Sequence, residues 1–170
     1  AEPLAAALEI LERVPITPND RVLVAGTGKL GQLICRVLAL TGCDLSVLGR
    51  SAAKLERLRD LDANFVAADS LKAGAFDIAI EATGNPEGLA LALTALRPQG
   101  TLVLKSTFPG AVTLDTTRLV VDEITLVGSR CGPFDKALAI LESRQIDPTG
   151  LIDGRYALDQ GLAAFEHGRR

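Results

Sequence analysis

The stretch VLVAGTGKLGQLICRVLALTG at residues 22–42 decides the fold, because a run of apolar residues changes there into a helical pattern at a glycine-rich turn. Gly26, Gly28 and Gly31 occupy the turn with the spacing GxGxxG. The residues that follow, 29–41, place apolar side chains three and four positions apart, as the buried face of a helix does. The stretch therefore predicts a buried strand, a tight turn and a helix, the first unit of a parallel α/β sheet.

The same glycines fit a turn that binds a dinucleotide. Gly26 permits the sharp bend, Gly28 leaves the backbone open to a pyrophosphate, and Gly31 lets the helix pack closely on the strand. Amide groups at the start of the helix lack helical partners and, with the positive end of the helix dipole, attract a diphosphate. The alternative is an empty turn, which the strand-turn-helix context disfavours. The candidate pyrophosphate-binding residues are Gly26, Thr27, Gly28, Lys29, Leu30 and Gly31.

Strand-like and helix-like segments alternate along the rest of the chain. The predicted strands cover residues 21–26, 44–49, 64–68, 76–83, 100–106 and 123–129. The predicted helices cover residues 3–13, 29–41, 51–61, 86–96 and 134–144. Most of these strands are apolar throughout, as in a parallel sheet covered on both faces. Right-handed crossovers then predict an α/β fold with a doubly wound six-stranded parallel sheet, a Rossmann fold of strand order 3-2-1-4-5-6.

The chain is predicted to form one dinucleotide-binding domain over residues 1–170, with a leading helix within residues 1–14. Residues 151–170 are expected to be a connecting segment, with an extended piece at 155–157 and a helix capped by Asp159. Both ends of the sequence are typical of a piece cut from a larger protein.

Composition narrows the functional classes. The apolar fraction of 48% suits one domain with a core, and the net charge of −3 with scattered basic residues argues against a nucleic-acid partner. No apolar run approaches the roughly 20 residues of a membrane span. Three cysteines without CxxC spacing and the absence of a basic leader favour a reducing cytoplasm. The only histidine, His167, cannot complete a metal site with neighbours in the sequence.

A polar cluster follows the second predicted strand, where the sequence reads LGRSAAK. NAD-dependent enzymes place Asp or Glu about 20 residues past the glycine motif to bind the adenosine ribose. Here Gly49 leaves space for a 2′-phosphate, Arg50 offers it a planar cation, and no carboxylate repels it. Ser51 stands at the expected N-cap, and Lys54 returns to the same face. We expect NADP rather than NAD; the alternative is an ordinary cap beside a solvated basic edge.

The ends of the last three predicted strands read EATGNPEG, LKSTFPG and VGSRCGPF. In open α/β sheets ligands lie beyond the carboxyl ends of the strands, so these ends are expected to meet the nicotinamide half of the cofactor. Strand ends also need turn residues, which leaves a structural role open for each one. The candidate nicotinamide-side residues are Thr83, Gly84, Ser106, Thr107, Gly128 and Ser129.

Four further polar residues receive separate interpretations. Glu81 lies inside an apolar strand and is expected to serve a structural hydrogen bond. Arg130 either pairs with a cofactor phosphate or caps a helix edge. Cys131 is interpreted as a small apolar residue, because nothing beside it lowers its pKa as a nucleophile requires. His167 is expected at a helix end in solvent.

Three longer stretches carry a family resemblance: EPLAAALEILERVPITPNDRVLVAGTGKLGQL, FDIAIEATGNPEGLALALTALRPQGTLVL and ITLVGSRCGPFDKALAILES. They resemble the medium-chain dehydrogenase/reductase superfamily, most closely its zinc-dependent alcohol, polyol and threonine dehydrogenase branch. The resemblance implies that this chain is the cofactor-binding half of an oxidoreductase, inactive by itself. It also implies that a GroES-like catalytic domain, absent here, carries the zinc ligands and recognises the alcohol or carbonyl substrate. Relatives often pair through the last strand, near Ile124 to Val127, as dimers or tetramers.

The resemblance also gives Glu2 a role, since it matches the Glu of a Glu-Pro motif near the catalytic zinc of polyol dehydrogenases. The alternative is that Glu2 only favours a helix start, with Pro3 in the first turn. Two other functions remain open from the sequence. One is a zinc-free quinone or enoyl reductase of the same superfamily. The other is a stand-alone Rossmann sensor that binds a nucleotide without catalysis.

Overall fold

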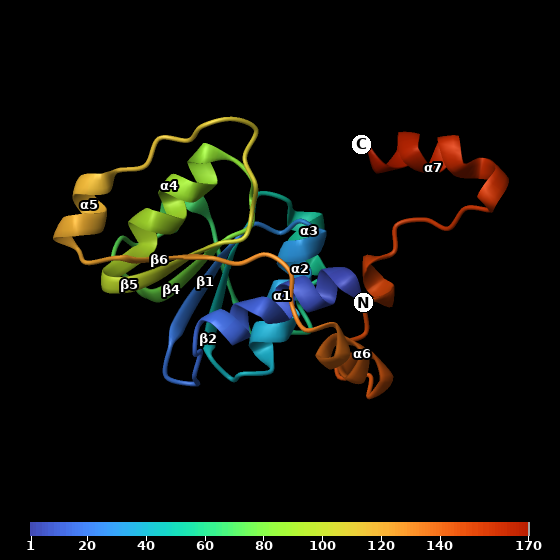
Figure 1. Cartoon of the computed structure of the whole chain (residues 1–170), viewed down its shortest axis with the longest axis horizontal. Helices are drawn as coiled ribbons and strands as arrows, with labels where there is room; N and C mark the ends of the chain where they lie inside the picture. The colour runs from blue at the N-terminus through green and yellow to red at the C-terminus, as the bar shows by residue number, and fades with distance from the viewer. Residues whose placement is uncertain (170) are drawn as a thin grey trace.

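Six parallel strands form one sheet in the order β3-β2-β1-β4-β5-β6 (Figure 1). The structure is a computed structural model that describes residues 1–169. The order confirms the predicted doubly wound α/β fold. The strands are β1 (Arg21–Ala25), β2 (Asp44–Leu48), β3 (Asn64–Val66), β4 (Phe76–Glu81), β5 (Leu96–Leu104) and β6 (Thr125–Gly128).

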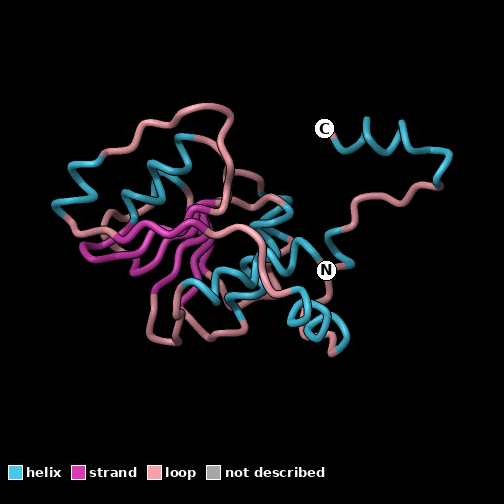
Figure 2. The backbone as a smooth tube through the Cα atoms, in the orientation of Figure 1, coloured by secondary structure: helices cyan, strands magenta, loops and turns pink. Residues whose placement is uncertain are grey.

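Helices cover both faces of the sheet (Figure 2). Among residues 1–169 they are α1 (Glu2–Arg13), α2 (Lys29–Ala39), α3 (Ala52–Glu56), α4 (Pro86–Ala95), α5 (Thr116–Val121), α6 (Phe134–Glu142) and α7 (Gly161–Gly168). One apolar cluster joins α1, α2 and α6 to one face, and a second joins α4 to the other. The tail that carries α7 projects from the body of the molecule (Figure 1).

Strand β1 shows how the core is divided between the faces. Val22 and Val24 belong to the cluster with α1 and α2, whereas Leu23 and Ala25 belong to the cluster with α4. All four are fully buried. Successive side chains of a strand point to opposite faces, so a strand covered on both sides must be apolar throughout. This is why β1 carries no alternation of polar residues.

Several predicted boundaries are wrong. The predicted helix at 51–61 is helical only over Ala52–Glu56. Residues 155–157 form no strand, and α7 begins at Gly161 with Gln160, not Asp159, at the N-cap. Helix α5 was not predicted, and Asp115 caps it by accepting a hydrogen bond of 3.2 Å from the amide of Arg118. Strand β5 begins earlier than predicted because Leu96 pairs with Phe76 across a register shift.

One carboxylate fastens the amino ends of β1 and β5 to β4. Asp77 accepts hydrogen bonds from the amide of Arg21 at 2.8 Å, from Nε of Arg21 at 3.0 Å and from Nε of Arg97 at 2.6 Å. The hydrogen-bonded guanidinium of Arg21 holds the pKa of the Asp77 carboxyl well below its usual range. Ionised Asp77 therefore stabilises the folded chain.

Changing Asp77 to Asn is expected to lower the free energy of unfolding at neutral pH by about 2 kcal/mol, because charge-assisted hydrogen bonds are lost. A depressed folded-state pKa gives stability that is present above the unfolded pKa and lost as the pH falls through the folded value. Urea unfolding should therefore show the difference between D77N and the unchanged chain staying constant from about pH 7 to about pH 5 and shrinking as the pH falls from about 5 to about 2. A difference that stays constant contradicts this account, and Asp62→Asn at an exposed position is the control.

Candidate dinucleotide-binding site

A cleft with a volume of about 360 Å³ opens at the carboxyl ends of β1, β2 and β4. It lies between β1 and β4, where the strand order reverses: β1 to β3 follow one another toward one edge of the sheet, and β4 to β6 toward the other. Open α/β sheets bind ligands at such a point. Eight predicted site residues line it: Gly26, Thr27, Gly28, Gly49, Arg50, Ser51, Lys54 and Thr83. The lining also includes residues that were not predicted, namely Leu48, Ala68, Ala82, Asn85, Glu87, Gly88 and Leu91.

The three glycines of the turn serve different purposes. Gly26 has φ +118°, and a Cβ there would lie 2.6 Å from the carbonyl oxygen of Ala82. A Cβ on Gly31 would lie 2.1 Å from the carbonyl oxygen of Gly26, so this glycine sets the close approach of α2 to β1. Nothing lies within 4 Å of a Cβ built on Gly28. Gly26 and Gly31 are therefore required by the fold, whereas Gly28 leaves space at the cleft.

The amino end of α2 has anion-binding character. Gly28 is its N-cap, and no side chain caps the helix. The amides of its first turn, at Lys29 and Leu30, are therefore available to a ligand in the cleft. The side chain of Leu30 packs against the core, so only its main chain is available for binding.

The end of β2 carries the basic edge of the cleft. Ser51 is the N-cap of α3, as predicted, but its hydroxyl forms no capping hydrogen bond. Arg50 and Lys54 line the same cleft, and both are exposed. A Cβ on Gly49 would lie 2.4 Å from Cγ2 of Thr27, so the buried Thr27 requires a glycine there. The space beside Gly49 is thus filled partly by protein, a constraint that the sequence did not reveal.

Glu81 organises the loop after β4. Its side chain is fully buried, and its Oε1 accepts hydrogen bonds from the amide of Thr83 at 2.6 Å, from the hydroxyl of Thr83 at 2.6 Å and from the amide of Gly84 at 2.9 Å. Its Oε2 has no hydrogen-bond partner among residues 1–169. The expected structural hydrogen bond is confirmed, and Glu81 fixes Thr83 against the cleft.

The start of α4 closes the cleft opposite the basic edge. Oδ1 of Asn85 accepts a hydrogen bond of 2.8 Å from the amide of Gly88. A Cβ on Gly88 would lie 2.1 Å from Oγ1 of Thr83, which ties α4 to the loop after β4. We missed both residues, although Asn followed by Pro86 is a recognisable helix start.

Apart from Thr83, the predicted nicotinamide-side residues lie at neighbouring strand ends and do not line this cleft. A Cβ on Gly84 would lie 3.9 Å from Cβ of Ser106 and from the carbonyl oxygen of Thr107, which brings the ends of β4 and β5 together. Gly128 ends β6, and the amide of the buried Ser129 donates to the carbonyl of Leu104 at 3.0 Å. These five residues therefore border one edge of the sheet.

A buried lysine at that edge was not predicted. Lys105 follows β5, and its Nζ donates hydrogen bonds to Oγ of Ser129 at 3.1 Å and to the carbonyl of Arg130 at 2.6 Å. Burial lowers the pKa of Lys105, and the nearby acidic groups of Glu9, Cys131 and Glu2 partly oppose this effect. A charged residue at the end of the apolar run TLVLK was the available signal.

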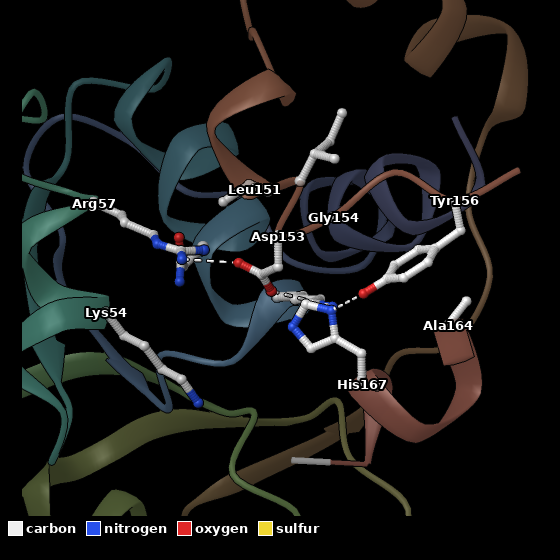
Figure 3. A pocket seen from close by; sticks show the side chains of 12 residues that line it. Lys54, Arg57, Leu151, Asp153, Gly154, Tyr156, Ala164 and His167 are labelled. Atoms are coloured by element: carbon white, nitrogen blue, oxygen red, sulfur yellow. Dashed lines mark hydrogen bonds and ion pairs between the residues drawn. The ribbon is translucent and has the colours of Figure 1, made fainter. Parts of the chain in front are cut away.

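A second hollow of about 640 Å³ lies between the body and the tail (Figure 3). Asp153 in the tail pairs with Nη2 of Arg57 at 2.8 Å and with Nζ of Lys29 at 3.5 Å. The side chain of Lys29 thus lies on this hollow, away from the cleft that its amide borders. His167 is exposed near the end of α7, as predicted, and hydrogen bonds to the hydroxyl of Tyr156.

The described residues do not fit a zinc ion. No group of three or more His, Cys, Asp or Glu side chains able to hold a metal occurs among residues 1–169. Glu2 is exposed in the first turn of α1, where its negative charge stabilises the helix by interacting with the positive end of the helix dipole. Cys131 is exposed, so it does not pack as an apolar core residue. Over the described part of the chain, no helix is long and apolar enough to cross a membrane.

The fold and cleft define an α/β domain of the Rossmann class. Residues 30–143 match the profile of the family described as zinc-binding dehydrogenase. The chain therefore belongs to the zinc-binding dehydrogenase family. This membership matches the resemblance seen in the sequence and does not favour a zinc-free reductase or a stand-alone sensor.

Individual relatives agree with this assignment. The sorbitol dehydrogenase of Gallus gallus is 29% identical over 99% of this chain and 52% of its own length. The structure of L-idonate 5-dehydrogenase from Escherichia coli superimposes with a TM-score of 0.89, at 24% identity over 98% of this chain and 51% of that one. S. aureus TarJ in complex with NADPH has a TM-score of 0.83, at 21% identity over 98% and 58%. The chain thus spans about half the length of the curated relatives it matches.

Proposed function

We propose that this chain is the NADP(H)-binding part of a zinc-dependent alcohol or polyol dehydrogenase. The observation that carries the proposal is the open position at Gly28. No atom lies near its Cβ position, the uncapped amino end of α2 begins there, and both face a cleft at the switch point of the sheet. Membership of the zinc-binding dehydrogenase family supports the reaction class.

Each half of the cleft has its own task in this proposal. The amides at the start of α2 bind the pyrophosphate. Arg50, Ser51 and Lys54 bind the 2′-phosphate of the adenosine ribose, where Arg50 supplies a bidentate cation. Thr83, held by Glu81, contacts the ribose side, and Ser129 at the end of β6 borders the nicotinamide.

The bound nicotinamide supplies hydride chemistry between its ring and an alcohol or carbonyl carbon. This chain's residues hold and orient that ring beyond the ends of β4, β5 and β6. Residues 1–169 do not assemble a metal site, so we assign the zinc and the recognition of the small alcohol or polyol to the part of the whole protein outside this chain. The three cysteines are free, which fits the reducing environment of the cytoplasm.

Two exposed apolar surfaces fit partners of the whole protein. Leu158, Leu162 and Phe165 in the tail are at least 78% exposed, and we propose that they pack against the missing half. In this proposal the whole protein consists of a catalytic part and the domain formed by residues 1–170.

The second apolar surface is the β6 edge of the sheet. Strand β6 has no further strand beside it within the described sheet, and Leu126 is 44% exposed. A second copy of the chain fits that edge, as a homodimer or within a tetramer.

Titration calorimetry on the chain tests the proposed function. NADPH should bind at one site and more tightly than NADH, because only NADPH carries the phosphate that the basic edge recognises. The same preparation mixed with NADP⁺ and sorbitol should produce no NADPH absorbance, because the catalytic part is absent. Absence of NADPH binding, or tighter binding of NADH, contradicts the assignment.

A further inference from the structure

Lys105 is a buried cation at the nicotinamide end of the sheet. Its residue is only 9% exposed, and its Nζ bridges Oγ of Ser129 and the carbonyl of Arg130. Both partners follow β6, whereas Lys105 follows β5. Among residues 1–169 no carboxylate forms an ion pair with it. The charge is therefore held in place without a direct counterion.

The oxidised and reduced forms of the cofactor differ in charge at the ring that this edge borders. The nicotinamide of NADP⁺ is a cation, and that of NADPH is neutral, while both forms share the same phosphates and adenosine. A fixed cation near the ring therefore repels only the oxidised form. Because Lys105 is buried, water screens its field less than that of a surface lysine.

We propose that Lys105 makes the cleft discriminate between the redox forms of the cofactor, weakening NADP⁺ relative to NADPH. This inference rests on the proposed function, since it requires the nicotinamide to lie beyond the ends of β5 and β6. It assigns Lys105 a role in cofactor selectivity, separate from the recognition of the 2′-phosphate at the end of β2.

Acidic groups near Lys105 partly oppose the effect of its burial. Glu2 and Glu9 of α1 and the thiol of Cys131 raise its pKa against the lowering effect of burial. Neither Glu2 nor Glu9 forms an ion pair with its Nζ among the described residues, so they weaken its field at the ring without neutralising it by direct contact. Two like unit charges about 10 Å apart, at an effective dielectric constant of about 20, repel one another enough to change a dissociation constant by roughly tenfold.

The experiment measures three dissociation constants by calorimetry: for NADPH, for NADP⁺ and for 2′-phospho-ADP-ribose, which lacks nicotinamide. In Lys105→Met, which keeps most of the side-chain volume, the ratio of the NADP⁺ to the NADPH constant should fall by about three- to tenfold. The affinity for 2′-phospho-ADP-ribose should stay unchanged, and Lys105→Arg should retain the ratio of the unchanged chain.

The outcomes separate this inference from the proposed function. An unchanged ratio in K105M, or an equal loss of affinity for all three ligands, overturns the inference and leaves Lys105 as a structural link between β5 and β6. If 2′-phospho-ADP-ribose and both cofactors fail to bind the unchanged chain, the proposed function itself fails.

A second measurement needs no change at Lys105. Because burial lowers the pKa of Lys105, raising the pH above neutral removes its proton earlier than it would from an ordinary lysine, and the ratio should fall as this happens. Glu2, Glu9, Cys131 and Arg130 are the other ionisable groups near Lys105. The chain carries Cys131→Ser for this measurement, which removes the thiol near Lys105. A ratio that does not change with pH contradicts the inference even if K105M fails to fold.

Discussion

Replacing Gly28 by alanine is expected to weaken NADPH binding by about 100-fold or more, because the methyl group enters the space that the pyrophosphate needs and disrupts at least two charge-assisted hydrogen bonds. The substitution should not destabilise the fold. Gly28 has φ −65° and ψ 177°, a conformation open to any residue, and nothing lies within 4 Å of the added Cβ. Calorimetry measures the affinity, and urea unfolding measures the stability, which should be equal to that of the unchanged chain or higher by about 0.5 kcal/mol.

Gly31→Ala is the matched control in the same turn. Its Cβ would lie 2.1 Å from the carbonyl oxygen of Gly26, so α2 must shift on the sheet. We expect the free energy of unfolding to fall by about 2–4 kcal/mol. The two variants therefore separate the ligand-binding role from the structural one. A G28A chain that binds NADPH normally would show that the motif is only a tight bend between strand and helix.

Changing Arg50 to alanine should narrow the preference for NADPH over NADH by about 10- to 100-fold, the effect of losing a charge-assisted interaction with a phosphate. The loss of binding affinity should be confined almost entirely to NADPH, because NADH lacks the 2′-phosphate. Arg50 is exposed and lines the cleft beside Ser51, so its removal should leave the stability unchanged within about 0.5 kcal/mol.

Parallel calorimetric titrations of R50A with NADPH and NADH test this expectation. Arg59→Ala is a suitable control, because Arg59 is exposed in the turn after α3 and among the described residues pairs only with Glu56, three residues before it. An equal loss of affinity for both cofactors would show that Arg50 contacts a part they share. The preference for NADP would then need another explanation.

The sequence predicted the sheet and its order because each buried strand is an unbroken apolar run. It predicted the boundaries less well where distant groups decide them. Helix α3 ends at Glu56, and the residues after it form turns in which Leu58 and Leu61 donate to the carbonyls three residues before them. Nη2 of Arg36 donates to the carbonyl of Arg57 at 2.7 Å and stabilises this non-helical segment. That contact spans 21 residues, and no local pattern contains it.

The candidate site was predictable in part for the same reason. The glycine turn and the basic edge are local motifs, and the structure brings both to one cleft. Two features depended on packing between strands that lie far apart in the sequence. One is the contact of Thr27 with Gly49, and the other is the bridge from Lys105 to Ser129. Lys29 lies within the motif, yet its side chain pairs with Asp153 from the tail.

The central claim is that main-chain amides at the start of α2 bind the pyrophosphate of a dinucleotide. Two-dimensional amide NMR of the ¹⁵N-labelled chain, titrated with ADP-ribose, tests it most directly, since this ligand carries the pyrophosphate without nicotinamide or 2′-phosphate. The account predicts that the largest shift changes fall on the amides of residues 27–31. Saturation without any change at these amides, or changes confined to other parts of the chain, would contradict it.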